Sequence, residues 1–178
     1  EFVPPDVSPL VGENLDQALD AAQRHRNPVV VALHGPAGED GSLACLLEDR
    51  GLPFTGSGSV ASAIAWNKAH AKVRVAAAGL PVLPSFTVSP GEASPPSNLW
   101  SWLERHDALL LKPVADGSSQ GLQVVRSTHD WQRAAPGLLV DYLVEPFVQD
   151  AREITVSVIN GGAGQLIALE PVEVRTQG

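Results

Sequence analysis

The sequence predicts an α/β fold built on an open sheet, because segments with helical periodicity alternate with short apolar segments typical of strands. Residues 14–24 place Leu15, Leu19 and Ala22 on one helical face. Residues 29–33 are uniformly apolar, which is typical of a strand covered on both faces. Glycine-rich loops separate several of these segments, and they provide places where a ligand can approach the main chain.

The first half of the chain is expected to be mainly helical. Asn14 is a suitable N-cap for the helix over residues 14–24, and Asn27-Pro28 ends that helix. A glycine-rich loop over residues 34–41 should follow the strand at 29–33. Two more helices are expected over residues 42–50 and 59–78, and the second of them ends at Gly79, which can adopt the left-handed conformation common after a helix.

The second half is expected to be richer in strands. The apolar runs predict strands over residues 82–88, 108–111, 122–125 and 138–145, separated by a Pro/Ser-rich loop over 89–97 and by helices over 99–105 and 128–135. Apolar and polar residues alternate over 153–159, as in a half-buried strand. Asn160-Gly161-Gly162 is a hairpin signal, so residues 166–174 should pair back on that strand.

Composition and charge narrow the class of protein. The chain has 178 residues, a formal net charge of −8 and one cysteine. An acidic chain without a basic stripe is not expected to bind nucleic acid. No apolar run approaches the roughly 18 residues that a membrane-spanning helix needs. The single cysteine and the lack of a visible secretory signal favour a reducing, cytoplasmic location.

The rare lysines stand out as candidate functional residues. The chain has nine arginines but only three lysines, Lys68, Lys72 and Lys112. In a sequence that favours arginine, a lysine marks a position that needs a compact ammonium group. Lys72 is interpreted as a solvated helix residue, which leaves Lys68 and Lys112 as the candidates.

Residues 112–121 form the most informative segment of the chain. Lys112 ends an apolar strand, and the loop after it contains Gly117, Ser118, Ser119 and Gly121. Consecutive main-chain N–H groups in such a loop can surround an anion, while hydroxyl groups add donors and a lysine adds charge. This segment therefore predicts a polyphosphate site. A polar hairpin that happens to contain glycine would give the same pattern, and this segment does not decide between them.

Three further candidates have a functional and a structural interpretation. His34 follows the predicted strand at 29–33, where α/β sheets bind ligands, but it could equally hydrogen-bond its own turn. Glu145 and Glu153 flank a short aromatic segment and could bind a nucleoside, or they could be solvated charges at strand ends. Residues 56–61 match G-x-G-x-x-A, but no acidic residue stands between Asp49 and Glu92, so a tight turn is favoured over an NAD site.

In combination, several segments resemble the D-alanine–D-alanine ligases of the ATP-grasp superfamily. They follow the family order from about residue 29 to residue 174: LHGPAGEDG (33–41), GLPFTGSG (51–58), Lys68, AGLP (78–81), KPVADGSSQG (112–121) and REITV (152–156). The resemblance implies part of a Rossmann-like N-terminal domain followed by an α+β ATP-grasp domain. It implies a partial substrate domain over 1–66, a central ATP-grasp subdomain over 67–145 and the beginning of a C-terminal subdomain over 146–178.

The resemblance also implies roles for particular residues. Lys68 and Lys112 would bind the phosphates of ATP, and Gly117, Ser118 and Ser119 would form a flexible lid over them. Ser118 would help to position the first D-alanine, and His34 would lie near its carboxylate. Residues of the adenosine site would be Glu145, Pro146, Phe147 and Val148 for adenine and Glu153 for ribose.

What the resemblance implies about the reaction is an ATP-dependent ligation of two D-alanine molecules through an acyl phosphate, for peptidoglycan synthesis. Asn67 and Pro146 depart from the family pattern, so a non-catalytic nucleotide-binding module is kept as an alternative, as is a ligase that joins D-alanine to D-lactate or D-serine. Mg²⁺ ligands are expected outside this segment. The expected partners are ATP and D-alanine, and a homodimer is compatible with this interpretation.

Overall fold

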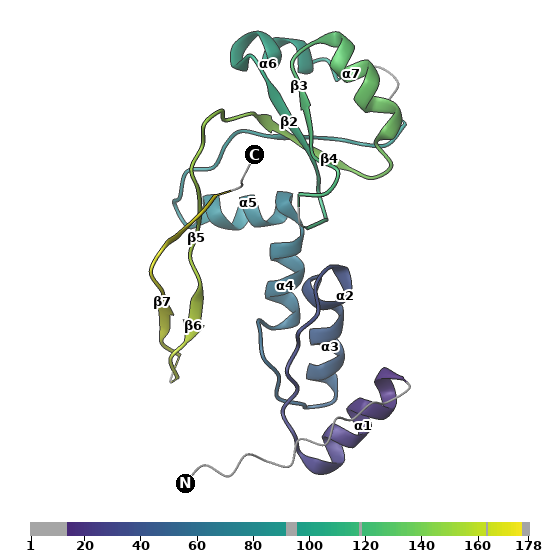
Figure 1. The fold of residues 1–178 in the computed structure, drawn as a ribbon, viewed down its shortest axis with the longest axis vertical. Coiled ribbons are helices and arrows are strands. Elements are labelled where there is room, and N and C mark those ends of the chain that lie inside the picture. The colour runs from purple at the N-terminus through teal and green to yellow at the C-terminus, as the bar shows by residue number, and fades with distance from the viewer. Residues whose placement is uncertain (1–13, 92–95, 118, 163, 176–178) are drawn as a thin grey trace. The chain divides into compact units, whose positions relative to one another are not determined.

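The computed structural model describes residues 14–91, 96–117, 119–162 and 164–175. Figure 1 shows the course of the chain. The chain divides into two compact units, residues 1–146 and residues 147–178, and each is described by itself. The expected Ser118 falls outside the described residues.

Helices dominate the first part of unit 1. They are α1 (Leu15–His25), α2 (Pro36–Glu39), α3 (Ser42–Asp49), α4 (Ser59–Trp66) and α5 (Lys68–Ala77). The Asn14 side chain accepts a hydrogen bond from Gln17 N, which confirms the predicted N-cap of α1. Leu19 and Ala22 of α1 pack with Leu47 and Leu52 in a small apolar cluster.

The predicted strand over residues 29–33 is not present as such. Val29 forms a single parallel bridge with Phe54, while Val30 and Leu33 are 74% and 53% exposed. A strand covered on both faces needs paired neighbouring strands and a layer of helices on each side. Among the described residues 14–66, the segment 29–33 has only the bridge from Val29 to Phe54. The α/β character is retained, but a Rossmann-like sheet in this part of the chain is not confirmed.

The single helix predicted over residues 59–78 is two helices, α4 and α5, which run in different directions (Figure 1). The break falls at Asn67, whose φ of −88° and ψ of 107° are extended. The Asn67 side chain accepts a hydrogen bond from His70 N and so caps α5. Its main chain bridges to Ala115, so a tertiary contact overrides the helical periodicity here.

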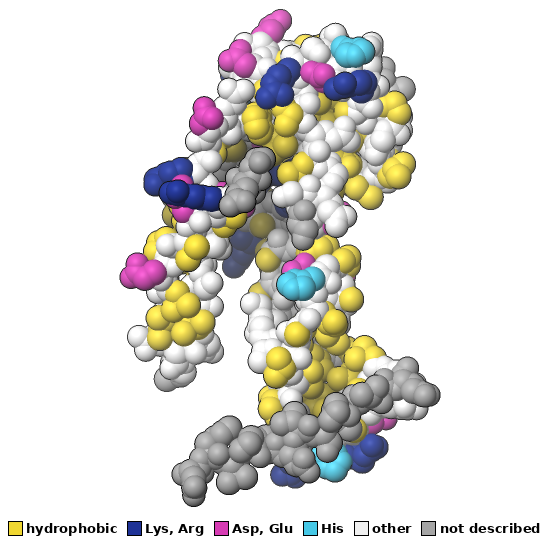
Figure 2. Space-filling model, in the orientation of Figure 1, with side chains coloured by type: hydrophobic (Ala, Val, Ile, Leu, Met, Phe, Trp, Pro, Cys, Tyr) yellow, Lys and Arg dark blue, Asp and Glu magenta, His cyan; other side chains and the backbone are white. Residues whose placement is uncertain are grey.

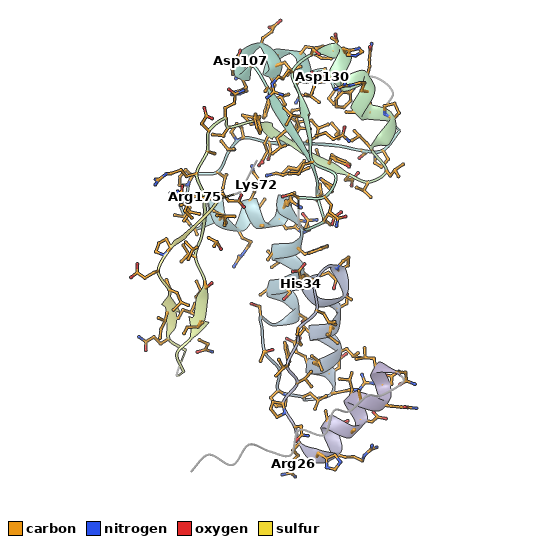
Figure 3. The ribbon with its side chains drawn as sticks, in the orientation of Figure 1. Arg26, His34, Lys72, Asp107, Asp130 and Arg175 are labelled. Carbon is orange, nitrogen blue, oxygen red and sulfur yellow. The ribbon has the colours of Figure 1, made fainter. Side chains whose placement is uncertain are left out.

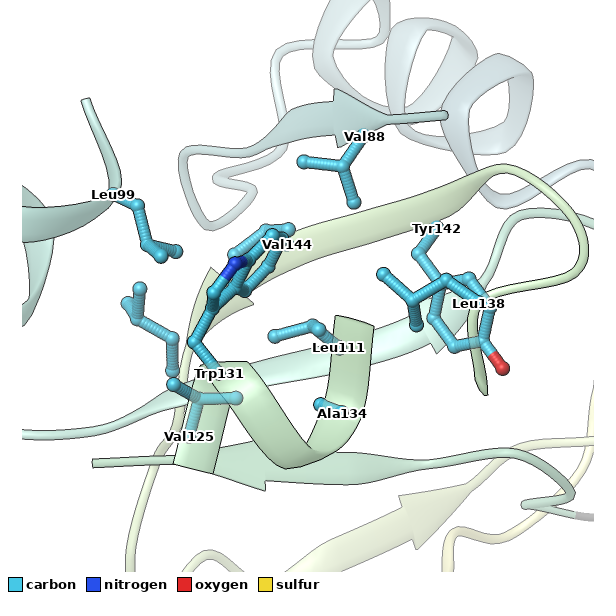
Figure 4. Packing of buried hydrophobic residues seen from close by; sticks show 10 residues of the cluster. Val88, Leu99, Leu111, Val125, Trp131, Ala134, Leu138, Tyr142 and Val144 are labelled. Atoms are coloured by element: carbon cyan, nitrogen blue, oxygen red, sulfur yellow. The ribbon is translucent and has the colours of Figure 1, made fainter. Parts of the chain in front are cut away.

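The core of unit 1 is a four-stranded antiparallel sheet with two helices on one face. The strands are β1 (Phe86–Val88), β2 (Leu109–Pro113), β3 (Gln123–Val125) and β4 (Tyr142–Pro146), in the order β1-β4-β2-β3. The helices are α6 (Leu99–His106) and α7 (Thr128–Ala134), and the short 3₁₀ turn η1 (Ala135–Gly137) follows α7. Leu99 of α6 and Trp131 of α7 pack against Leu111 and Val144 of the sheet (Figure 4).

Unit 2 consists of two short antiparallel ladders. Strand β5 (Glu153–Thr155) pairs with β8 (Val172–Val174), and β6 (Val158–Asn160) pairs with β7 (Leu166–Ala168). The predicted return of residues 166–174 onto 153–159 is thus confirmed, although each strand is interrupted. Every residue described in 148–175 is exposed, and apolar side chains show on the surface of β6 and β7 (Figure 2). In the described part of the chain, no helix is long and apolar enough to cross a membrane.

Truncation of Leu111 should test the packing of the sheet against its helices. Leu111 is 0% exposed and Leu139 is 82% exposed. We expect Leu111→Ala to lower the free energy of unfolding by about 2–5 kcal/mol, and Leu139→Ala to change it by less than about 0.5 kcal/mol. Denaturant titration followed by tryptophan fluorescence measures both. Equal effects of the two substitutions would contradict this packing.

Candidate functional site

Strand alternation places Lys112 and Glu145 on the same face of the sheet. Leu109 and Leu111 of β2 are buried in the core beneath α6 and α7, so Leu110 and Lys112 point to the opposite face. Strands β2 and β4 pair in a register that sets Leu110 opposite Glu145. Lys112 lies two residues further along β2, a diagonal separation that long side chains can span.

Glu145 is a buried carboxylate held by two ammonium groups. Its side chain is 6% exposed, and its Oε1 and Oε2 contact the Nζ atoms of Lys72 and Lys112, respectively. Moving an ionised carboxylate out of water costs several kcal/mol, and well-placed cations are needed to offset that cost. Of the two interpretations of Glu145 that the sequence left open, the solvated strand-end charge is therefore wrong.

Lys68 reaches the same region from the start of α5. Its main-chain N–H donates to Val114 O at 2.8 Å, and its Nζ donates to Asp116 O at 2.6 Å. Both bonds depend on the break at Asn67, which lets the first residue of α5 meet the loop that follows β2. The structure thus brings together Lys68 and Lys112, the two lysines selected from the sequence.

The surroundings of Lys68 lower its pKa below the ordinary value. Partial burial makes the largest contribution and the charge of Lys112 adds to it, while Asp116 acts in the opposite direction. The folded protein therefore binds this proton less tightly than the unfolded chain does. The protonated Lys68 side chain therefore lowers the free energy of unfolding at neutral pH. This loss disappears as the pH rises through the lowered pKa.

Lys72 is the functional candidate that the sequence interpretation missed. It was expected to be solvated, but its side chain is 18% exposed and contacts Glu145, and its Nζ donates to Leu83 O at 2.5 Å. It lies one helical turn after Lys68, on the same side of α5; Figure 3 shows it on that helix. The i, i+4 spacing of two rare lysines was the signal that could have found it. We refer to Lys68, Lys72, Lys112 and Glu145 as the Glu145 cluster.

The glycine loop after β2 folds close to this cluster. Gly117 N donates to the Asp116 carboxylate at 2.7 Å. Ser119 has a φ of +56° and is exposed. Gly121 has a φ of +69°, and a Cβ there would lie 2.9 Å from the Pro113 side chain, so this turn requires glycine.

The His34 loop approaches the same glycine loop through Glu39. A Cβ on Gly117 would lie 3.5 Å from Glu39 Oε2. That oxygen accepts a hydrogen bond from Gly35 N, and Oε1 lies 4.0 Å from His34 Nδ1. The His34 side chain itself is 99% exposed and stands just before α2 (Figure 3). Two of the glycine-rich motifs, far apart in the sequence, are thus neighbours in space.

The remaining predicted residues begin at the end of β4. Pro146 is the last residue of β4 and is partly exposed. Phe147, Val148 and Glu153 belong to unit 2, where Glu153 opens β5 opposite Val174. Their spatial relation to the Glu145 cluster stays a prediction.

The G-x-G-x-x-A segment is a helix start that already holds a carboxylate. The Glu48 side chain accepts hydrogen bonds from Ser59 N at 2.9 Å and from Ser59 Oγ, at the beginning of α4. These bonds lower the pKa of Glu48, the hydroxyl having the larger effect. A cofactor pyrophosphate would need those same N–H groups. The structure therefore favours a structural turn over the NAD site.

The Glu145 cluster is chemically suited to a polyanion. Two ammonium groups contact one buried carboxylate. A third, that of Lys68, is bound to the loop after β2 and lies close enough to Lys112 for the two charges to interact. Within the described residues, no group of three or more His, Cys, Asp or Glu side chains is arranged to hold a metal ion.

Comparison with known proteins identifies the family. Residues 75–178 match the family described as D-ala D-ala ligase C-terminus. The chain belongs to this family. A D-alanine–D-alanine ligase of Citrifermentans bemidjiense is 37% identical over 164 residues, which cover 90% of this chain and 50% of that protein. The chain thus spans about half the length of the curated relatives that it matches.

Solved ligase structures have the same fold. The D-alanine–D-alanine ligase of Coxiella burnetii superposes with a TM-score of 0.72 at 31% identity, over 82% of this chain and 44% of that one. The VanG D-Ala:D-Ser ligase of Enterococcus faecalis gives a TM-score of 0.67 at 28% identity, over 82% and 42% of the two chains. The predicted ATP-grasp architecture agrees with these structures, and the structure shows that its four-stranded sheet is antiparallel.

The charges of Lys112 and Asp116 shift the pKa of Lys68 in opposite directions, and two substitutions should separate their effects. We expect Lys112→Met to raise the pKa of Lys68 toward its ordinary value and Asp116→Asn to lower it further, because each removes one neighbouring charge. The ¹³Cε resonances of the three lysines, followed against pH, give this pKa directly. Arg24→Met, a change at an exposed position of α1, is the control. Shifts of the same sign in both variants would contradict the geometry.

Proposed function

We propose that the complete protein is an ATP-dependent D-alanine–D-alanine ligase that supplies the dipeptide for peptidoglycan synthesis. The family membership and the ligases named above support this proposal. The observation that carries it is the convergence of the Lys68 and Lys112 ammonium groups beside the glycine loop at 116–121. Phosphoryl transfer depends mainly on positioning and on charge neutralisation, and these residues can provide both.

In the proposed nucleotide site, Lys68 and Lys112 bind the phosphates of ATP. Gly117, Ser118 and Ser119 form a lid that closes over them and excludes water, since an acyl phosphate is easily hydrolysed. Partial burial lowers the pKa of Lys68 most and the charge of Lys112 lowers it further, and an anion bound between the two ammonium groups would relieve their repulsion.

Adenine and ribose are assigned to the end of β4 and to the chain that follows it. Glu145, the carbonyl of Pro146, and residues Phe147 and Val148 would hold adenine, and Glu153 would hold ribose. Proline lacks an N–H group but keeps its carbonyl, so the departure at Pro146 is compatible with a carbonyl contact to the base.

The proposed reaction has two steps. A carboxylate oxygen of the first D-alanine attacks the γ-phosphorus of ATP, and ADP leaves. The amine of the second D-alanine attacks the acyl phosphate, forms the peptide bond, loses a proton and releases phosphate. His34 would lie near the carboxylate of the first D-alanine and Ser118 would help to position it, as catalytic residues.

The wider setting follows from the same proposal. Mg²⁺ would neutralise phosphate charge, with ligands that we place outside residues 1–178. A Rossmann-like substrate domain, a cytoplasmic location and a homodimer are further parts of the proposal. The proposed partners are ATP and D-alanine rather than a nucleic acid or a membrane.

The second substrate remains a separate choice within the proposal. D-Serine is the first alternative, since a D-Ala:D-Ser ligase is 28% identical to this chain; D-lactate is another. A non-catalytic nucleotide-binding module is the competing class, and the departures at Asn67 and Pro146 are its motivation.

Phosphate release distinguishes these functions. The complete protein, given ATP, Mg²⁺ and D-alanine, should release phosphate and form D-alanyl-D-alanine, measured by a coupled phosphate assay and by mass spectrometry. D-Serine or D-lactate supplied with D-alanine tests the alternative ligases. ATP binding without turnover of any of these substrates would favour the non-catalytic module.

Removal of the Lys112 ammonium group should weaken nucleotide binding. A hydrogen bond to a charged group contributes about 1.5–3 kcal/mol, so Lys112→Ala should raise the dissociation constant for ATP roughly 10- to 100-fold. Isothermal titration calorimetry on the complete protein measures this. Arg24→Ala removes a cation from an exposed position of α1 and should leave the affinity unchanged. Equal affinities of wild type and Lys112→Ala would remove Lys112 from the site.

A further inference from the structure

The two ammonium partners of Glu145 are anchored differently. Lys72 Nζ contacts Glu145 Oε1 and also donates to Leu83 O at 2.5 Å. Leu83 precedes β1, which pairs with β4, the strand that carries Glu145. Lys72 is therefore bound both to Glu145 and to the chain that leads into the neighbouring strand β1. Its own helix, α5, is held at its start by the loop at 114–116.

Lys112 is placed for a different task. It contacts Glu145 Oε2 and lies near the end of β2, just before the glycine loop. Lys68 is close enough for the charges of the two lysines to interact. A lysine bound to a buried carboxylate is not available to a phosphate. For Lys112 to bind phosphate, Glu145 must keep another counterion, because an unpaired buried charge is strongly unfavourable.

We propose that Lys72 is a positioning residue for nucleotide binding, which remains with Glu145 as its fixed counterion and so allows Lys112 to leave Glu145 for the phosphates. This inference rests on the proposed function, since it needs a nucleotide to attract Lys112. Lys72 does not itself bind phosphate, because its Nζ is already engaged by a carboxylate and a carbonyl.

The inference is tested by nucleotide affinity in the Lys72→Met variant. With Lys72 removed, Lys112 is held by Glu145, and the dissociation constant for the β,γ-imido analogue of ATP with Mg²⁺ should rise about tenfold. Calorimetry on the complete protein measures this. Arg74→Met is the matched control, because it removes a cation from an exposed position on the same helix and should leave the affinity unchanged.

A second comparison separates positioning from a simple structural role. Neutral glutamine does not hold Lys112 as a carboxylate does, so Lys72 should become dispensable once Glu145 is replaced. We expect Glu145→Gln and the double variant Lys72→Met/Glu145→Gln to bind the analogue with equal affinity. The double variant also carries no unpaired buried charge, so this comparison stands even if Lys72→Met alone fails to fold.

Each result has one meaning. Weaker binding by Lys72→Met, together with equal binding by the two Glu145→Gln proteins, supports the inference. Unchanged affinity in Lys72→Met overturns it and leaves the proposed function intact. A weaker double variant than Glu145→Gln alone, or a loss in Arg74→Met equal to that in Lys72→Met, also overturns it. No binding by the wild-type protein overturns both the proposed function and this inference.

Discussion

The buried carboxylate of Glu145 is the constraint on which the arrangement of this site depends. An ionised group that is 6% exposed needs cations beside it, and the chain supplies them from two different elements, α5 and β2. The ion pair of Lys72 with Glu145 links α5 to the face of the sheet that α6 and α7 leave open. The apolar core on one face and the ionic cluster on the other are thus consequences of a single strand alternation in β2 and β4.

The same cluster is left with an excess of positive charge. Glu145 offsets part of the charge of Lys72 and Lys112, while Lys68 is bound to a main-chain carbonyl rather than to a carboxylate. Partial burial and the neighbouring ammonium group of Lys112 both lower the pKa of Lys68. A site that holds cations together before its ligand arrives has already met the energetic cost of their repulsion, and an anionic ligand relieves that cost. This is the physical sense in which the cluster is prepared for a polyphosphate.

Much of the fold followed from local pattern, and the failures share one cause. The predictions of α1 with its Asn14 cap, of the strands around Lys112 and Glu145, and of the pairing in unit 2 rest on periodicity and turn residues, and the structure confirms them. The predictions of a strand at 29–33 and of an unbroken helix at 59–78 were wrong, because contacts between distant parts of the chain decide the conformation of both segments. Lys72 was missed for the same reason: nothing in its immediate neighbours in sequence reveals that its partner is Glu145, 73 residues away.

The break at Asn67 shows how one tertiary contact can create a site that sequence periodicity conceals. A continuous helix over residues 59–78 would carry Lys68 in mid-helix, where its main-chain N–H would bond within the helix. Because Asn67 is extended and bridges to Ala115, that N–H instead binds Val114 O, and α5 begins at Lys68. One turn later, Lys72 falls beside Glu145. The helix start therefore sets the positions of both lysines at once, with Lys68 at the glycine loop and Lys72 at the buried carboxylate.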